Sequence, residues 1–352
     1  MSLLFEPLKL RGLTIRNRAW LAPMCQYSAK DGLPDDWHLV HYGARAAGGF
    51  GLLMAEAAAV VPEGRITPYD VGLWSDAQAN RWRRIVGFAH GEGAMMGVQL
   101  AHAGRKGSVL RPWIGDASVS VEDGGWQAVG VSEEPFPGYA NPVGLTSEQV
   151  ASVPEQFADA ARRAQAAGFD TVEIHAAHGY LLHQFLSPLT NTRSDEYGGS
   201  PRNRARLLLE VADAVREVWP DEKPLMVRLS ATDWLPGGLE VEEVALIAAQ
   251  LGSRGVDLID VSTGGLLPAP MSVGPGYQLP HARRIRSKTG LPTAAVGLIS
   301  TPLQAEQVLV DEAADVVMLG RVALRDPSWP LRAAHELGSQ IRWPRQLERG
   351  AW

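Results

Sequence analysis

The stretch EIHAAHGYLLHQFLSP, residues 173–188, begins as a buried strand and then presents two imidazoles and a phenol within six residues. His175 and His178 are three residues apart, so a continuing strand would place them on opposite faces. The chain must therefore turn into a loop if both rings are to reach one ligand. In that geometry two neutral N–H donors can hold one anionic or carbonyl oxygen, with Tyr180 nearby as an acid. This pattern indicates an oxyanion clamp beside a proton donor.

Two simpler interpretations remain open for these residues. A single histidine or tyrosine at a strand end is often a core residue with satisfied hydrogen bonds. The His-x-x-His spacing, followed by His183, also suggests a metal site. Zinc sites, however, usually close with cysteine or carboxylate ligands in fixed spacings, and the chain has no His-Glu-x-x-His motif. We therefore expect no metal here.

The composition is that of a soluble globular protein. The chain has 352 residues, of which 45% are hydrophobic and 20% charged, and this allows a large core. The formal net charge is −6 and no Lys/Arg block stands out, so we expect no nucleic-acid or membrane partner. Cys25 is the only cysteine, which excludes an internal disulfide and fits a reducing, cytoplasmic location. No run approaches the ~18 apolar residues of a membrane span.

Short apolar runs alternate with amphipathic segments along the whole chain, which is typical of repeated β-α units and a parallel sheet. The predicted strands are residues 17–24, 50–56, 95–102, 171–175, 225–230, 258–263, 293–297 and 315–320. The predicted helices are residues 38–47, 77–92, 147–167, 201–219, 241–254, 282–289, 302–309 and 327–338. Eight such units predict an α/β fold, a single-domain (β/α)8 TIM barrel, with active-site loops at the C-terminal ends of the strands.

A doubly wound open sheet is the alternative fold. Against it, no Gly-x-Gly-x-x-Gly follows the first strand, and polar residues recur near most strand ends. We therefore predict a barrel over residues 1–340 and a C-terminal tail over residues 341–352. Residues 104–146 are rich in Gly, Pro, Ser and Trp without a helical period, and we interpret them as an excursion over the barrel mouth, such as a hairpin, after the third strand.

The strand ends indicate a cofactor site. Gly297 and Gly320 lie in turns that open helices after the seventh and eighth strands, where barrels often bind a phosphate, and Arg321 adds a cation. The alternative is that these glycines merely permit tight turns and that Arg321 is solvated. Arg228 ends the fifth strand in an apolar context and needs an anionic or acceptor partner, while Gln99 offers a donor and an acceptor to a flat heterocycle. Together these features predict a pocket for flavin mononucleotide (FMN).

From residue 4 to the C-terminus the chain resembles the Old Yellow Enzyme family of FMN-dependent ene-reductases, and in particular its bacterial YqjM-like branch. The motifs that carry the resemblance are APMCQY (22–27), QLAHAGRK (99–106), HAAHGY (175–180), NTRSDEYGGS (191–200) and LGR (319–321). Ala22 departs from the serine common in this branch. Val296 stands where some relatives carry a tryptophan, and this departure affects the expected shape of the substrate pocket.

The resemblance implies the roles of particular residues. It implies FMN binding by Ala22, Pro23, Met24, Cys25, Ala57, Gln99, Arg228, Gly320 and Arg321. It implies that His175 and His178 hold the substrate's carbonyl or nitro oxygen, that Tyr180 delivers a proton, and that Tyr27 contacts substrate. NADPH or NADH would reduce FMN, and an α,β-unsaturated carbonyl or nitro compound would then be reduced by a ping-pong mechanism.

The tail ends in Glu348-Arg349-Gly350-Ala351-Trp352, and relatives in the YqjM-like branch insert a similar arginine into the neighbouring subunit's active site. The resemblance thus implies a homodimer or homotetramer in which Arg349 lines the partner's substrate pocket. A tail packed on its own barrel is the alternative.

Two rival functions stay open from the sequence. One is a flavin-free lyase or isomerase that binds a sugar phosphate on the same barrel. The other is a non-catalytic flavin-binding redox sensor with Cys25 as the sensing residue. The larger dienoyl-CoA reductases share the barrel, but they need a cysteine cluster and extra domains, which we do not expect in this chain.

Overall fold

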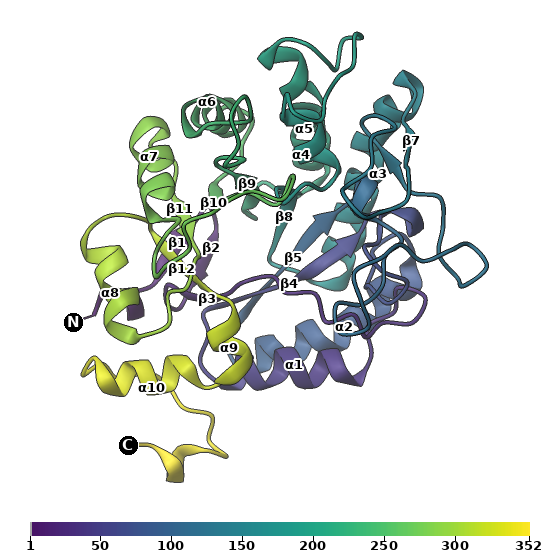
Figure 1. Ribbon diagram of the computed structural model, residues 1–352. Helices are drawn as coiled ribbons and strands as arrows, with labels where there is room; N and C mark the ends of the chain where they lie inside the picture. Colours follow the sequence, from purple (N-terminus) through teal and green to yellow (C-terminus); the bar gives the residue numbers. More distant parts are fainter. Residues whose placement is uncertain (1) are drawn as a thin grey trace.

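Eight parallel strands close into a barrel in the computed structural model, which describes residues 2–352 (Figure 1). All their residues are buried except Met95. The prediction of a (β/α)8 barrel is confirmed. In chain order the strands are β3 (Ala19–Leu21), β4 (Leu52–Ala59), β5 (Met95–Ala101), β8 (Thr171–Ala176), β9 (Leu225–Ser230), β10 (Leu258–Ser262), β11 (Thr293–Ala295) and β12 (Val316–Leu319).

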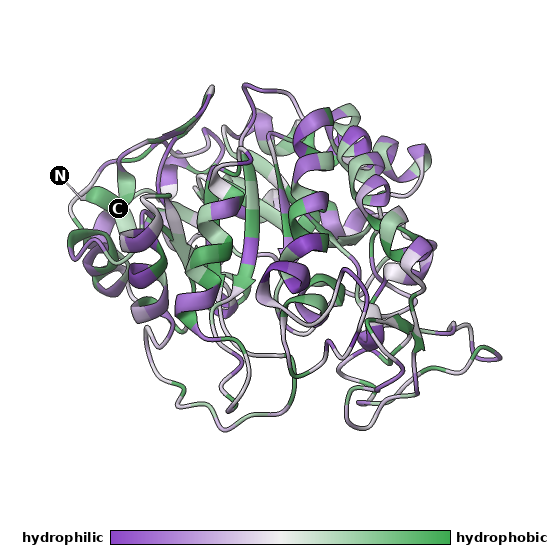
Figure 2. Ribbon diagram, turned by 90° about the horizontal axis from the view of Figure 1, so that it is seen from above, coloured by the Kyte–Doolittle hydropathy of each residue, from purple (hydrophilic) through white to green (hydrophobic). Residues whose placement is uncertain are grey.

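Helices surround the barrel, with their apolar faces on the strands, and in Figure 2 they alternate between hydrophobic green and hydrophilic purple along their turns. The long ones correspond to the predicted helices with small shifts at their ends: α1 (Asp36–Ala47), α2 (Asp76–Gly91), α3 (Ser147–Ala167), α5 (Pro201–Val218), α6 (Val241–Gly252), α7 (Leu279–Thr289), α8 (Pro302–Val310) and α10 (Trp329–Glu336). Two short helices, α4 (Leu181–Leu186) and α9 (Arg321–Arg325), were not predicted, because five or six residues are too few to display a 3.6-residue period. No helix within residues 2–352 is long and apolar enough to cross a membrane.

An antiparallel hairpin lies before the first barrel strand and was also missed from the sequence. Its strands are β1 (Leu8–Leu10) and β2 (Leu13–Ile15). Leu10 and Ile15 pack in a second apolar cluster with Trp20 of β3 and Met226 of β9. This cluster fills the barrel interior near the N-terminal ends of the strands, which leaves the opposite end for polar residues.

The excursion after β5 contains little regular structure. It begins with the 3-10 helix η3 (Gly104–Lys106) and includes β6 (Val129–Gly130) and β7 (Val143–Gly144). These two strands pair in parallel. A hairpin-like pairing lies earlier in the excursion, where Val109 and Ser118 form an antiparallel bridge flanked by the bonds Leu110 N–H to Ala117 O and Val119 N–H to Ser108 O. The remaining short 3-10 helices are η1 (Leu3–Phe5), η2 (Pro62–Gly64) and η4 (Glu348–Gly350).

Phe157 offers a test of the core between α3 and the barrel. Its side chain is fully buried in the main apolar cluster. We expect Phe157→Ala to lower the free energy of unfolding by about 3–5 kcal/mol, because the substitution removes buried apolar surface and leaves a cavity where the ring was. Chemical denaturation should show this loss, whereas Leu246→Ala, on the exposed face of α6, should change stability by less than about 0.5 kcal/mol. Equal effects of the two substitutions would contradict the packing described.

Candidate active site

The chain turns sharply where β8 ends, and this turn brings three predicted site residues together. His178 has a φ of 58° and Gly179 a φ of 75°, both in the left-handed region. His175 is still in β8, while Tyr180 caps the N-terminus of α4. The ring centroid of His175 lies 5.1 Å from that of His178 and 4.8 Å from that of Tyr180. The loop geometry required for a two-histidine clamp is therefore present.

The turn is held by a close approach of backbone from the β10–α7 loop. A Cβ on Gly179 would lie 2.4 Å from the carbonyl oxygen of Gly265, so only glycine fits. Lys106 joins the two segments, because its Nζ donates to the carbonyl oxygens of His178 and Gly265, each at 3.0 Å. The position of the clamp thus depends on three loops that are far apart in the sequence.

His183 supports the turn from below. The backbone N–H of Gly179 donates to Nδ1 of His183 at 2.9 Å, so the ring proton is on Nε2. That Nε2 lies 3.0 Å from Oδ1 of Asp233, and both side chains are fully buried. Asp233 also accepts from Ser187 at 2.7 Å and from the Leu239 N–H at 2.8 Å. His183 is therefore a positioning residue in this structure.

The hydrogen bonds around His175 fix which of its nitrogens carries the proton. The N–H of Ala177 donates to Nδ1 of His175 at 3.2 Å, which leaves the neutral ring with its proton on Nε2. Nε2 of His178 lies 2.6 Å from the Ser262 hydroxyl, and Ser262 lies 3.2 Å from Oε1 of Gln278. Sequence reasoning missed Ser262 and Gln278, because nothing local links them to a histidine that precedes them by 84 residues or more.

Burial keeps the clamp neutral and the tyrosine protonated. Burial lowers the pKa of His175 and of His178 well below the usual value, and the positive charge of Arg228 lowers both further. Both rings are therefore neutral at physiological pH. Burial also raises the pKa of Tyr180 well above 10, so its hydroxyl keeps its proton.

A row of polar side chains crosses the barrel beneath the clamp. Nε2 of Gln99 on β5 donates to Oε1 of Glu173 on β8 at 2.7 Å. Nε of Arg228 on β9 lies 3.1 Å from Oδ2 of Asp260 on β10. The two groups form an ion pair but not a well-aligned hydrogen bond. We predicted from the sequence that Arg228 needs an anionic or acceptor partner, and the structure shows that this partner is Asp260. Burial, with the negative charge of Asp260, raises the pKa of Glu173 to about 8.

A cavity of about 410 Å³ opens beside this row, at the C-terminal ends of β9 to β12. Four residues predicted to bind the cofactor line it: Arg228, Gly297, Gly320 and Arg321. Arg325, one turn further along α9, also lines it and was not predicted. The cavity therefore has one arginine, Arg228, on the barrel side and two, Arg321 and Arg325, on the side of α9.

The loop after β3 contains four further residues predicted to bind the cofactor, Ala22, Pro23, Met24 and Cys25. It lies beside β12, because the N–H of Ala22 donates to the carbonyl oxygen of Leu319 at 3.1 Å. Glu56, fully buried in β4, anchors the loop by accepting from the Gln26 N–H at 2.8 Å. Burial raises the pKa of the Cys25 thiol well above its usual value.

Ala57, Tyr27 and Arg349 occupy three different places. Ala57 is in register with Gln99 on the neighbouring strand. Tyr27 lies edge-on to Trp113 of the excursion, with ring centroids 5.9 Å apart, and burial raises its pKa. Arg349 is exposed in η4, and no contact joins it to the site residues of its own chain within residues 2–352. No three His, Cys, Asp or Glu side chains in the described part of the chain are grouped to hold a metal.

Comparison with known proteins identifies the class to which this arrangement belongs. A profile of the NADH:flavin oxidoreductase / NADH oxidase family matches residues 3–340, and the chain belongs to this family. An NADPH dehydrogenase from Geobacillus thermodenitrificans is 47% identical over 351 residues, which is 99% of this chain and 98% of the relative.

Solved structures agree with this assignment and with the Old Yellow Enzyme resemblance. Morphinone reductase matches with a TM-score of 0.81 and 30% identity, over 97% of this chain and 91% of that one. An Old Yellow Enzyme homologue from Zymomonas mobilis matches with a TM-score of 0.80 and 29% identity, over 97% and 95% of the two chains. The protein is therefore a flavin oxidoreductase of the Old Yellow Enzyme type, with FMN as cofactor and a nicotinamide nucleotide as reductant.

The residues present fit FMN. Its phosphate needs cations, and Arg321 and Arg325 both line the cavity. Its flat ring needs donors and an acceptor, which Arg228 on β9 and Gln99 on β5 offer from the two strands that flank β8. The family membership and this donor set argue against the flavin-free lyase or isomerase.

The pair of His183 and Asp233 can be tested by a double-mutant cycle. We expect His183→Ala to lower the free energy of unfolding by about 3 kcal/mol or more, because Asp233 loses a buried partner. Asp233→Ala should also destabilise the protein, and the double variant should cost less than the sum of the two single changes. Denaturant unfolding of the holoenzyme measures all three values, and strict additivity would mean that the two side chains do not interact.

Proposed function

We propose that this enzyme reduces the activated C=C bond of α,β-unsaturated carbonyl or nitro compounds with NADPH or NADH, by a ping-pong mechanism. The observation that carries the proposal is the convergence of His175, His178 and Tyr180, whose ring centroids lie within 5.1 Å of the central His175 ring. Two neutral imidazoles and one protonated phenol are the groups that such a reaction requires.

The two histidines bind and polarise the activating oxygen of the substrate. Nε2–H of His175 is free to donate, because its Nδ1 already accepts from Ala177. The Ser262 hydroxyl can donate either to Oε1 of Gln278 at 3.2 Å or to Nε2 of His178 at 2.6 Å. The clamp requires the second arrangement, in which the proton of the His178 ring is on Nδ1. Oε1 of Gln278 then keeps its bond from Thr263 at 2.9 Å. Both donors then stabilise the negative charge that develops on the oxygen during the reaction.

Tyr180 delivers a proton to the α-carbon of the substrate. The raised pKa of its hydroxyl keeps the acid form present at neutral pH. Tyr27, next to Trp113, contacts the substrate from the side of the excursion. FMN, when bound, supplies hydride transfer to the β-carbon. Ala22 to Cys25, Ala57, Gln99, Arg228, Gly297, Gly320 and Arg321 hold the cofactor.

A non-catalytic redox sensor is less well supported. Sensor cysteines have low pKa values and are accessible, so that the reactive thiolate is present. Cys25 is partly exposed, but desolvation of its thiol, together with the negative charges of Asp70 and Glu56, raises its pKa. Cys25 therefore fits a neutral thiol that shapes the cofactor environment.

The clamp can be tested by phenol binding. Phenols bound over oxidised flavin give a charge-transfer band, and we expect the double variant His175→Ala/His178→Ala to lose it, because both oxygen ligands are removed. Reduction of FMN by NADPH in stopped-flow experiments should change far less than the later oxidation by an enone. His90→Ala, on the surface of α2, is the control and should keep the band. An unchanged phenol titration in the double variant would refute the clamp.

We further propose that the enzyme is a homodimer or homotetramer in which Arg349 lines the substrate pocket of the neighbouring subunit. Within its own chain the tail is held mainly at its end, where Trp352 stacks on His335 of α10 with ring centroids 5.3 Å apart. Arg349 is exposed and Trp352 remains 64% exposed, although tryptophan is costly to leave in water. These exposed groups support a tail that completes its contacts on a second copy.

Mixed subunits test the shared site. Arg349→Ala and Tyr180→Phe subunits should each be poorly active alone, because each lacks one residue in every site. Reassembled mixtures should regain part of the activity with an enone, since one site of a mixed dimer contains both residues. Tagged copies of the two variants allow the mixed dimers to be purified and assayed. No recovery in verified mixed dimers, or a strictly monomeric enzyme, would disprove the arrangement.

A further inference from the structure

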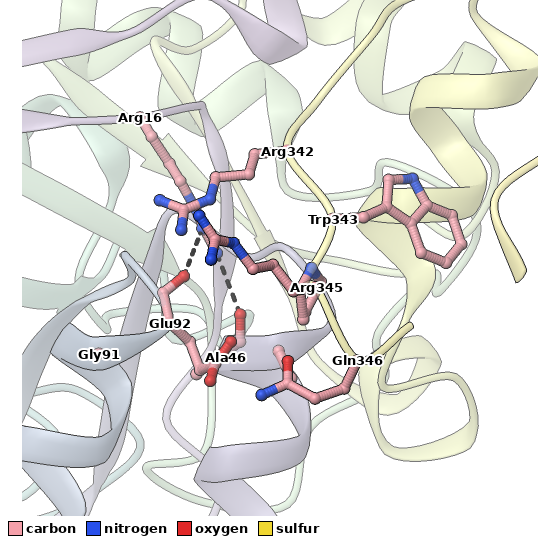
Figure 3. A pocket seen from close by; sticks show the side chains of 10 residues that line it. Arg16, Ala46, Gly91, Glu92, Arg342, Trp343, Arg345 and Gln346 are labelled. Atoms are coloured by element: carbon pink, nitrogen blue, oxygen red, sulfur yellow. Dashed lines mark hydrogen bonds between the residues drawn. The ribbon is translucent and has the colours of Figure 1, made fainter. Parts of the chain in front are cut away.

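A second cationic cavity lies at the opposite end of the barrel from the candidate active site. It has a volume of about 140 Å³ and is lined by Arg16, Arg342 and Arg345 (Figure 3). Arg16 follows β2 at the N-terminal end of the barrel, and the two other arginines lie in the segment that leads into the tail. Figure 3 shows the three guanidinium groups close together, beside Glu92.

Arg16 is fully occupied by the C-terminal ends of α1 and α2. Its guanidinium donates to the carbonyl oxygens of Ala46, Phe50 and Glu92 at distances between 2.7 and 3.1 Å. Ala46 belongs to the last turn of α1 and Glu92 is the C-cap of α2, whereas Phe50 lies beyond the end of α1. Arg342 therefore approaches a cation whose N–H donors are already bonded to backbone carbonyl oxygens rather than to a carboxylate.

The three positive charges have no matching carboxylate. No ion pair involving any of them is found within residues 2–352. Glu92 is the acidic group facing the cavity, and its charge does not compensate fully: burial and the charge of Arg342 lower the pKa of Arg16 to about 10. Converging like charges without a counter-ion are unfavourable unless an anion joins them.

We propose that this cavity binds a phosphate ion, held by Arg342 and Arg345 against Arg16. Guanidinium groups present paired N–H donors that match the oxygens of phosphate. The cavity is several times larger than the ~30 Å³ that one water occupies in the liquid, so it accepts a small hydrated anion. Gln346, which also lines the cavity, adds an amide donor. The bound anion ties residues 342–346 to the ends of α1 and α2.

Thermal unfolding of the FMN-saturated enzyme tests the proposal, since a filled cofactor cavity cannot take the added phosphate. Inorganic phosphate should replace chloride at constant ionic strength. We expect phosphate at ten times its Kd to raise Tm by about 2 °C. The variant Arg342→Gln/Arg345→Gln should lose this rise. The matched control Arg81→Gln/Arg202→Gln removes the same charge at exposed positions and should keep it.

Hydrogen exchange locates the effect. Phosphate should slow amide exchange in residues 341–347 of the native enzyme and of the control, but not in the Arg342→Gln/Arg345→Gln variant. Flavin content and circular dichroism check that each variant is folded and loaded. A phosphate-dependent rise in Tm of equal size in all three proteins would overturn the proposal, because it would place the anion elsewhere. No rise in the native enzyme, or no protection of residues 341–347, would overturn it as well.

Discussion

The left-handed turn at His178 and Gly179 is the constraint on which the candidate active site depends. A strand that continued straight would separate the two imidazoles, and a side chain at position 179 would collide with the backbone of Gly265. Lys106 then locks the turn by donating to carbonyl oxygens on both sides. The clamp is thus assembled from β8, the β10–α7 loop and η3, and it is as rigid as the contacts between those three segments.

The buried charged side chains inside the barrel largely neutralise one another. Arg228 pairs with one buried carboxylate, Asp260, while burial and the negative charge of Asp260 raise the pKa of a second, Glu173, which favours its neutral form. Arg228 and Asp260 then cancel one another, and Gln99 satisfies one oxygen of Glu173. A neutral row of this kind avoids the large cost of an unpaired buried charge. Arg228 also lines the cavity proposed for FMN.

Periodicity in the sequence was sufficient to predict the eight strands and the long helices, because each barrel strand is a buried run and each helix has one apolar face. The helices α4 and α9 are too short to display a 3.6-residue period. The hairpin strands β1 and β2 bury only their last residue, so they do not form a buried run. The clamp residues could be predicted because they lie in one short stretch. Ser262, Asp233 and Asp260 could not, because each acts on a residue that is distant in sequence and near only after the barrel has closed. The position of the tail could not be predicted from the sequence either. The sequence suggested that the tail contacts a neighbouring subunit, whereas in the single chain Trp352 stacks on His335.

Closure of the barrel joins the two ends of the chain. Residues 19–21 of β3 pair with residues 317–319 of β12, and Glu306 of α8 accepts hydrogen bonds from the N–H groups of Leu3 and Leu4. During synthesis at about 5–20 residues per second, β3 therefore waits roughly 15–60 s for its partner strand. Over that time it presents an unpaired apolar edge, which is the kind of surface that aggregates. Exposure of this edge until β12 has been made is therefore a consequence of a barrel that closes between its first and last strands.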